Sequence, residues 1–305
     1  MKVVESKIKP FLKWAGGKTQ LLQQIIENLP ENIEQIRKYV EPFVGAGAVF
    51  LCLASNNCFD EYIINDINHK LINLYIVMRD NCDELIEELR ILKELYLSLE
   101  SIEKKEEFYY KIRDEFNEEN SNSIRMGALF VFLNKTCFNG LYRENSKGKF
   151  NVPFGKHISP GIYQENEIRD ISQVLNTKNS NGELKVKILN TSFENINEYI
   201  DNNTFVYFDP PYRPVTLGGF NSYSKSGFND DSQIKLRDFY DDMDKKGAKL
   251  MLSNSDPRIL DKDDDFFDLL YKKFSIKRVR ASRMINSKGS GRGAISELLI
   301  TNYDK

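Results

Sequence analysis

The sequence predicts an α/β fold in which a mostly parallel sheet carries helices on both faces. β-rich runs alternate with helical runs along the 305 residues, and this alternation is typical of parallel sheets with helical crossovers. A glycine-rich turn joins the first predicted strand to a helix and a second strand, which makes a βαβ unit. No apolar run approaches the roughly 18 residues that a bilayer span needs.

The N-terminal part supplies the first elements. Apolar residues at helical spacing predict a helix over 21–29, which Pro30 ends. Residues 39–43 then predict a short strand that enters the glycine turn. Residues 48–54 are apolar all round, as expected of a helix packed on a sheet. Residues 61–65 are a second β-rich run, which completes the βαβ unit.

The rest of the chain adds helices first and then strands. Residues 68–120 are helical and highly charged, and 125–133 form an apolar helix. Residues 134–160 are rich in Asn, Gly, Ser, Lys and aromatics, so we expect a loop that departs from the core. A helix ending near Lys246 precedes the third of the remaining strands. These strands are predicted at 185–189, 204–208, 249–253, 275–281 and 295–302.

Composition excludes several classes of protein. The net charge of −2 argues against a protein that coats nucleic acid through global charge. Only His69 and His157 are present, which excludes a histidine-rich metal site. The four cysteines form no CxxC pair, so we expect free thiols and no metal. Because no apolar leader stands at the N-terminus, we expect a cytoplasmic protein.

The glycine turn Glu41-Pro42-Phe43-Val44-Gly45-Ala46-Gly47 is the first motif with chemical meaning. Glycines let the backbone approach a ligand closely. Asp66 follows Gly47 by 19 positions at the end of the next strand, where a carboxylate accepts hydrogen bonds from a ribose diol. Phe50 stands at the position of the third glycine of the GxGxxG dinucleotide pattern, so a pyrophosphate site of the NAD type is disfavoured. The pattern favours an adenosine cofactor without phosphates, such as S-adenosylmethionine.

A second glycine motif, Trp14-Ala15-Gly16-Gly17-Lys18-Thr19, is similar to the end of a phosphate-binding loop. That loop requires a further glycine at position 12, which is Leu12 here. No clear hydrophobic strand precedes the motif. An NTP-dependent enzyme is therefore disfavoured.

The third motif, Asp209-Pro210-Pro211-Tyr212, directly follows the predicted strand 204–208. An exocyclic aromatic amine is a poor nucleophile because its lone pair is delocalised into the ring. The Asp209 carboxylate and the Pro210 carbonyl offer two acceptors for its N–H bonds, and the prolines limit how far these acceptors move. Tyr212 supplies a ring for stacking a purine, worth about 1–3 kcal/mol. A base reaches such a pocket only after leaving the duplex stack.

Together with further stretches, these motifs closely resemble Dam-type (alpha-group) DNA adenine-N6 methyltransferases. The matching stretches are 11–18, 41–47, 138–143, 150–155 and 209–212. The resemblance implies a doubly wound, Rossmann-like methyltransferase sheet of seven mostly parallel strands with one antiparallel edge strand. It also implies an inserted, smaller helical and β-hairpin DNA-recognition domain at 69–164, with 1–68 and 165–305 forming the catalytic domain.

The activity implied is transfer of the methyl group of S-adenosylmethionine to N6 of a flipped adenine in double-stranded DNA, typically within GATC. The implied catalytic residues are Asp209, Pro210 and Tyr212. The implied cofactor contacts are Trp14, Lys18, Phe43, Gly45, Gly47, Asp66 and Asp209. Double-stranded DNA is the expected partner, and a restriction endonuclease with the same target is left open as a second one.

The implied DNA-reading hairpin matches residues 139–155. Its expected contacts are Phe138, Asn139, Leu141, Arg143 and Pro153. Arg143 suits a bidentate contact to guanine, with a phosphate contact as the alternative. Separately, residues 272–292 hold eight Lys or Arg and no Asp or Glu. We hypothesise that Arg283, Lys288 and Arg292 in this basic run contact the DNA backbone.

Other interpretations stand beside this one. An RNA or protein N-methyltransferase could use the same pocket, and labelled cofactor offered to DNA, RNA and protein would separate these classes. A catalytically silent DNA-binding regulator is disfavoured because the motif at Asp209 is intact. Lys18 could pair with a carboxylate rather than touch the cofactor, and Trp14 could be a core residue.

Overall fold

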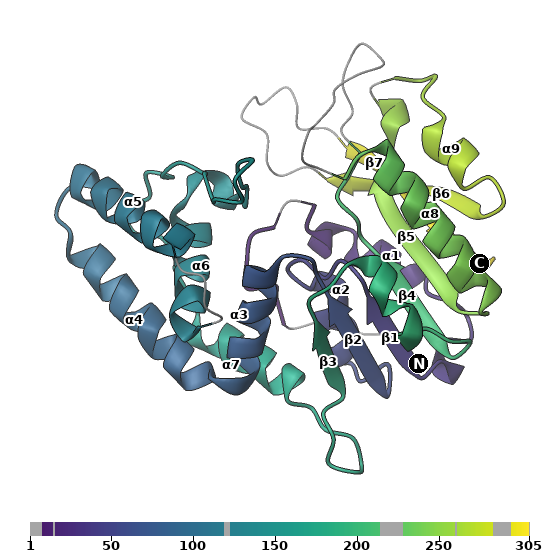
Figure 1. Cartoon of the computed structure of the whole chain (residues 1–305), viewed down its shortest axis with the longest axis horizontal. Coiled ribbons are helices and arrows are strands. Elements are labelled where there is room, and N and C mark those ends of the chain that lie inside the picture. The colour runs from purple at the N-terminus through teal and green to yellow at the C-terminus, as the bar shows by residue number, and fades with distance from the viewer. Residues whose placement is uncertain are drawn as a thin grey trace.

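The computed structural model describes residues 8–14, 16–118, 123–213, 228–259, 261–282 and 294–304. A twisted sheet flanked by helices makes up one part of the molecule, and the helices α4, α5 and α6 lie on the side away from α8 and α9 (Figure 1). None of the helices within the described ranges combines the length and the apolar character that crossing a bilayer needs.

Seven strands form the sheet in the part of the chain that the structure describes, in the order β3-β2-β1-β4-β5-β7-β6. They are β1 (Lys38–Glu41), β2 (Glu61–Asn65), β3 (Val186–Leu189), β4 (Thr204–Phe208), β5 (Lys249–Ser255), β6 (Ser275–Ser282) and β7 (Ala294–Thr301). The first five strands of this order run parallel, whereas β7 is antiparallel to both β5 and β6.

The expectation that the antiparallel strand lies at the edge of the sheet is therefore wrong. The antiparallel strand is β7, and it is second from the edge. β6 and β7 pair from Ser275↔Thr301 to Ser282↔Ala294, so β7 returns antiparallel beside β6. Its other side pairs with β5. This inserts β7 between β5 and β6 and leaves β6 at the edge.

The helices alternate with the strands in the first and last parts of the chain and follow one another in the middle. The α-helices are α1 (Leu22–Glu27), α2 (Ala48–Ser55), α3 (His69–Asp80), α4 (Cys82–Ser98), α5 (Ile102–Glu118), α6 (Ile124–Thr136), α7 (Glu165–Leu175), α8 (Asp230–Lys245) and α9 (Phe266–Leu270). The short 3₁₀ helices are η1 (Lys18–Gln20), η2 (Ile33–Gln35), η3 (Phe138–Gly140), η4 (Phe193–Tyr199) and η5 (Pro257–Ile259).

Two apolar clusters cover the two faces of the sheet. Along β4, Phe205 and Tyr207 belong to one cluster, and Val206 and Phe208 to the other, as the alternation of side chains along a strand requires. Both clusters are fully buried at these positions. Strands covered on both faces read as continuous apolar runs, which explains the composition of β4.

The cluster on the α2 face continues without interruption into the middle of the chain. α6 packs against α3, α4 and α5, and its residues from Met126 to Asn134 are all buried. A helix that is apolar all round is expected in such a position. The segment after α6 folds back through isolated antiparallel bridges, Cys137↔Phe154 and Glu144↔Phe150.

Candidate active site

Turns at the carboxyl ends of three neighbouring strands carry the predicted site. β1 leads into the glycine turn, β2 into Asp66 and β4 into Asp209. These strands are adjacent and parallel in the order β2-β1-β4, so their carboxyl ends lie at the same edge of the sheet. β1 is also where the strand order reverses, and ligands of open α/β sheets bind at such a point.

The glycine turn has a backbone that only glycine adopts without strain. Gly45 and Gly47 have φ angles of 49° and 72°. A Cβ atom on Gly47 would lie 2.5 Å from the hydroxyl of Tyr75, and one on Gly45 would lie 2.9 Å from the Trp14 ring. The Tyr75 hydroxyl donates to the Gly45 carbonyl at 3.0 Å. The turn is therefore packed tightly between α3 and the N-terminal segment.

Asp66 is fixed at the end of β2 by backbone donors on both of its oxygens. The Gly45 N–H donates to Oδ2 at 3.1 Å, and the Asn68 N–H donates to Oδ1 at 2.9 Å. Burial raises the pKa of Asp66 above its ordinary value, and these hydrogen bonds offset part of that rise. Asn68 also caps α3, because its side chain accepts from the Lys70 and Leu71 amides.

Ile67 is a candidate site residue that the sequence reasoning missed. It directly follows Asp66, and 72% of its surface is exposed at the edge where the predicted ligand residues gather. An exposed isoleucine beside a carboxylate offers an apolar surface for a flat ring. The signal in the sequence was an apolar residue immediately after the acid that ends a strand.

Lys18 and Asp209 form an ion pair at the centre of the site. Lys18 Nζ lies 2.6 Å from Asp209 Oδ1, and the lysine side chain is only 3% exposed. The same Nζ donates to the Gly16 carbonyl at 2.6 Å. Burial raises the pKa of Asp209, while the charge of Lys18 and a hydrogen bond from Ser253 lower it. The structure therefore gives Lys18 the carboxylate partner that was one of its two interpretations.

The residues after Asp209 are held in place from several sides. The Tyr212 ring lies 4.6 Å from Lys18 Nζ, and its hydroxyl donates to Glu297 Oε2 at 2.5 Å. Gln233 donates to the Pro211 carbonyl at 3.2 Å. Within the described ranges no residue donates to the carbonyl of Pro210.

Trp14 and Phe43 belong to different surroundings. Trp14 stacks on Tyr142 with ring centroids 5.4 Å apart, and Tyr142 stacks on Phe130 at 5.0 Å. The tryptophan thus joins the glycine turn to the segment after α6. Phe43 packs instead against Phe193, with centroids 5.5 Å apart, in the cluster on the other face of the sheet.

The predicted DNA-contacting residues fall into a described group and an undescribed group. All five members of the first group are exposed: Phe138, Asn139, Leu141, Arg143 and Pro153. Arg143 donates from Nε to Asn151 Oδ1 at 2.8 Å. Asn139 has a positive φ of 57°. Arg283, Lys288 and Arg292 lie outside the described residues.

Asn134 joins the N-terminal segment to the start of this exposed loop, a contact that the sequence did not reveal. Its Oδ1 accepts from the Lys13 amide at 2.9 Å, and its Nδ2 donates to the Lys13 carbonyl at 2.8 Å. Nδ2 also donates to the Gly140 carbonyl at 3.0 Å. The two segments are therefore held together by one buried side chain.

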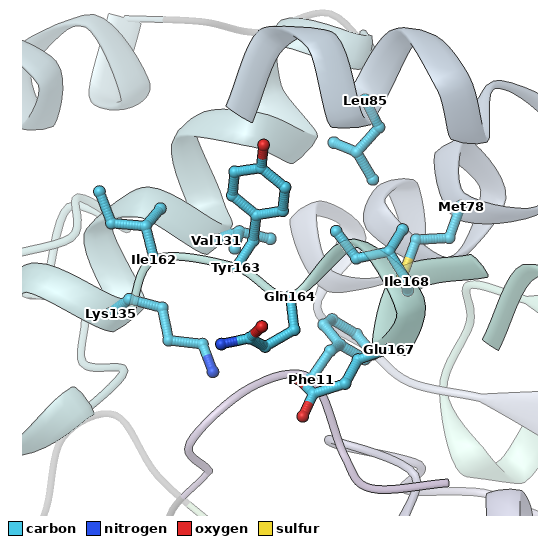
Figure 2. Close-up of a pocket in the computed structure, with 10 residues that line it drawn as sticks. All are labelled: Phe11, Met78, Leu85, Val131, Lys135, Ile162, Tyr163, Gln164, Glu167 and Ile168. Atoms are coloured by element: carbon cyan, nitrogen blue, oxygen red, sulfur yellow. The ribbon is translucent and has the colours of Figure 1, made fainter. Parts of the chain in front are cut away.

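A small cavity lies beside the N-terminal segment, which contributes Phe11 to its lining, and none of the predicted site residues lines it (Figure 2). Its lining is mostly apolar: Phe11, Met78, Leu85, Val131, Ile162, Tyr163 and Ile168, with Lys135, Gln164 and Glu167. Phe11 packs edge-on against Tyr75 with centroids 5.5 Å apart. The cavity thus borders the residues that support the glycine turn rather than the site itself.

The chain is similar to known DNA methyltransferases over nearly its whole length. The family described as D12 class N6 adenine-specific DNA methyltransferase matches residues 14–285. The type II methyltransferase M.MjaIII of Methanocaldococcus jannaschii is 51% identical, over 97% of this chain and 100% of that protein. The type II methyltransferase M1.LlaDCHI of Lactococcus lactis subsp. cremoris is 36% identical, over 97% and 96%. The DNA adenine methylase of Escherichia coli (strain K12) is 33% identical, over 96% and 95%.

Proposed function

Because the chain belongs to the D12 class N6 adenine-specific DNA methyltransferases, we propose that it transfers the methyl group of S-adenosylmethionine to N6 of an adenine flipped out of double-stranded DNA, within GATC. The observation that carries this proposal is the Asp209 carboxylate, held on one oxygen by Lys18 beside the Pro210 carbonyl. That pair of acceptors suits an aromatic amine.

The residues at the sheet edge fit S-adenosylmethionine chemically. Asp66 is a fixed carboxylate of the kind that binds a ribose diol. The exposed Ile67 beside it suits the adenine ring. Trp14, Phe43, Gly45 and Gly47 would form the surrounding wall, with Lys18 and Asp209 binding polar groups of the methionine part. When bound, the cofactor supplies a methyl carbon activated by a sulfonium, which leaves as a neutral thioether.

The chain's own residues would orient and polarise the amine of the target base. The amine donates one N–H to Asp209 and the other to the Pro210 carbonyl, which favours a pyramidal nitrogen with an available lone pair. The Tyr212 ring stacks on the flipped purine, and its hydrogen bond to Glu297 fixes the ring. The nucleophile is the base's own nitrogen, so no covalent enzyme intermediate forms.

We propose that residues 69–164 form the target-recognition domain and that the exposed loop after α6 reads the DNA. Phe138, Leu141 and Pro153 present apolar surface to the bases, and Arg143 presents a guanidinium. Asn139 would help to hold the opened stack. Arg283, Lys288 and Arg292 remain our hypothesis for backbone contacts.

The biological setting is also part of the proposal. DNA as substrate suits an enzyme in the cytoplasm. Two of the compared proteins are named type II methyltransferases and one DNA adenine methylase, so a restriction endonuclease with the same target remains a partner to test. Co-purification from the native cell would test it.

The test offers labelled S-adenosylmethionine with four substrates: a GATC duplex, a matched duplex with a scrambled site, RNA and protein. We expect N6-methyladenine only in the GATC duplex. Asp209→Ala should abolish transfer while the protein stays folded by circular dichroism. Label in RNA or protein would contradict the proposed substrate, and normal turnover by Asp209→Ala would remove Asp209 from the mechanism.

A further inference from the structure

Ser253 has a fully buried hydroxyl next to the turn that carries Asp209, and none of the sequence motifs includes it. It lies on β5, one residue beyond Leu252, which pairs with Phe208 at the end of β4. Its Oγ lies 3.2 Å from Asp209 Oδ1 and 2.9 Å from the hydroxyl of Tyr207. A third neighbour, the Phe208 carbonyl, lies at 3.4 Å.

Counting protons assigns the direction of these hydrogen bonds. A serine hydroxyl carries one proton and accepts through two lone pairs. Burial raises the pKa of Tyr207 well above its ordinary value, so the phenol keeps its proton and can donate it to Ser253. The Ser253 proton is then free for Asp209 Oδ1, the closer of its two remaining acceptors.

The two oxygens of Asp209 consequently differ. Oδ1 accepts from Lys18 Nζ at 2.6 Å and from Ser253 Oγ at 3.2 Å. No donor to Oδ2 is present among the residues that the structure describes. Two donors on one oxygen oppose rotation of the carboxylate, so the other oxygen keeps a fixed direction.

We infer that Ser253, itself oriented by Tyr207, is a positioning residue that directs Asp209 Oδ2 toward the adenine amine. The inference rests on the proposed role of Asp209. It gives a buried polar residue of β5 a role in the reaction without contact to the base.

The pH dependence of the reaction distinguishes positioning from packing. Among the described residues, the titratable groups around Asp209 are Lys18 of η1, Glu41 of β1, Tyr207 of β4, Tyr212 after β4 and Glu297 of β7. Each remains when Ser253 is changed. A hydrogen bond donated to a carboxylate favours its charged form, so removing the Ser253 hydroxyl should raise the pKa of Asp209.

The experiment compares Ser253→Ala with Ser253→Thr, which retains a hydroxyl, and with Ser255→Ala as a control two positions along the same strand. We measure kcat and KM for DNA and S-adenosylmethionine across pH, cofactor binding by calorimetry, and thermal unfolding. Carbon-13 NMR of labelled aspartate, assigned with Asp209→Asn, follows the carboxyl of Asp209 directly in the unliganded protein.

For Ser253→Ala we expect kcat to fall about 10- to 100-fold, with KM for DNA within about twofold. The acidic limb of kcat and the Asp209 carbon titration should both move to higher pH, and Ser253→Thr should restore part of each. Ser255→Ala should match the wild type in every respect.

An unshifted acidic limb in Ser253→Ala would overturn the inference, even if thermal stability fell, because packing alone would then account for Ser253. Asp209→Asn separates this failure from failure of the proposed function. If Asp209→Asn is inactive while Ser253→Ala is normal, only the inference fails. If Asp209→Asn turns over normally, the proposed mechanism itself fails.

Discussion

Lys18 and Asp209 connect two segments that are far apart in the sequence, through a contact of 2.6 Å between Nζ and Oδ1. Lys18 begins the short helix η1 at the end of the N-terminal glycine motif, and Asp209 follows β4. Burial makes the ionised carboxylate costly, and the nearby ammonium offsets that cost. The pair therefore favours the charged form of the Asp209 carboxylate in a partly enclosed site.

Replacing Lys18 should change the pH at which the enzyme works. Burial already raises the pKa of Asp209, and Lys18 is the strongest influence that lowers it. In Lys18→Met the pKa of Asp209 should rise further, so the carboxyl becomes neutral at higher pH than in the wild type. We expect the acidic limb of kcat at saturating cofactor to move upward, with activity partly recovered in alkaline buffer.

The matched control is Lys9→Met, which removes an exposed lysine nearby in the sequence and should leave the limb in place. If the limb of Lys18→Met coincides with that of the wild type while kcat falls evenly at all pH values, the ammonium does not tune Asp209.

Ile67 should contribute to cofactor binding and not to the chemical step. Its side chain is 72% exposed beside Asp66, so cofactor binding would remove apolar surface from water. Ile67→Ala should weaken S-adenosylmethionine binding by about 1–2 kcal/mol, or roughly 5- to 30-fold, as measured by calorimetry without DNA. At saturating cofactor kcat should be unchanged.

Leu269→Ala is the matched control for this change, because Leu269 is 62% exposed on α9. It should bind the cofactor as the wild type does. Equal affinities in Ile67→Ala and the wild type would place the adenine ring elsewhere.

Arg143 should read a base. Its Nε is held by Asn151 Oδ1 at 2.8 Å, which leaves other donors of the exposed guanidinium for the DNA. Arg143→Ala should reduce discrimination between GATC and single-base variants by about 10- to 100-fold, measured as ratios of kcat/KM. Lys147→Ala, which removes an exposed charge from the same loop, should preserve discrimination.

If Arg143 contacts a phosphate instead of a base, Arg143→Ala should change DNA binding in a different way. A phosphate contact would weaken binding to all sequences equally and lower the slope of affinity against salt by about one. Binding isotherms at several salt concentrations separate these two roles.

Most of the sheet could be predicted from the sequence because its strands carry their signal locally. β4 is buried at every position, and its residues 205–208 are apolar or aromatic because both faces of the strand are covered. The place of β7 could not be predicted in this way. Its position between β5 and β6 depends on which strands pair, and the apolar pattern of a strand does not record its neighbours.

The same distinction applies to the site. Asp66 and Asp209 stand in motifs where the residue type and its place after a strand carry the chemistry. Ser253 and Glu297 are polar residues inside β-rich runs and belong to none of these motifs. They become partners of Asp209 and Tyr212 only through the order of β4, β5 and β7 in the sheet. The spacing of residues along the sequence does not indicate that strand order.

Gly47 should tolerate no side chain, for two separable reasons. Its φ of 72° costs a residue with a Cβ atom about 1–2 kcal/mol. The new Cβ would also lie 2.5 Å from the Tyr75 hydroxyl, and such crowding in a packed region costs about 1–3 kcal/mol more. Gly148 has a similar φ of 70° with nothing within 4 Å of the added atom, so Gly148→Ala measures the backbone cost alone.

We expect Gly47→Ala to lower the free energy of unfolding more than Gly148→Ala in denaturant titrations. Adding Tyr75→Phe should recover part of the difference, because it removes the clashing oxygen, and a double-mutant cycle isolates that coupling. Equal losses at the two glycines would mean that α3 shifts freely and that the turn is not packed as described.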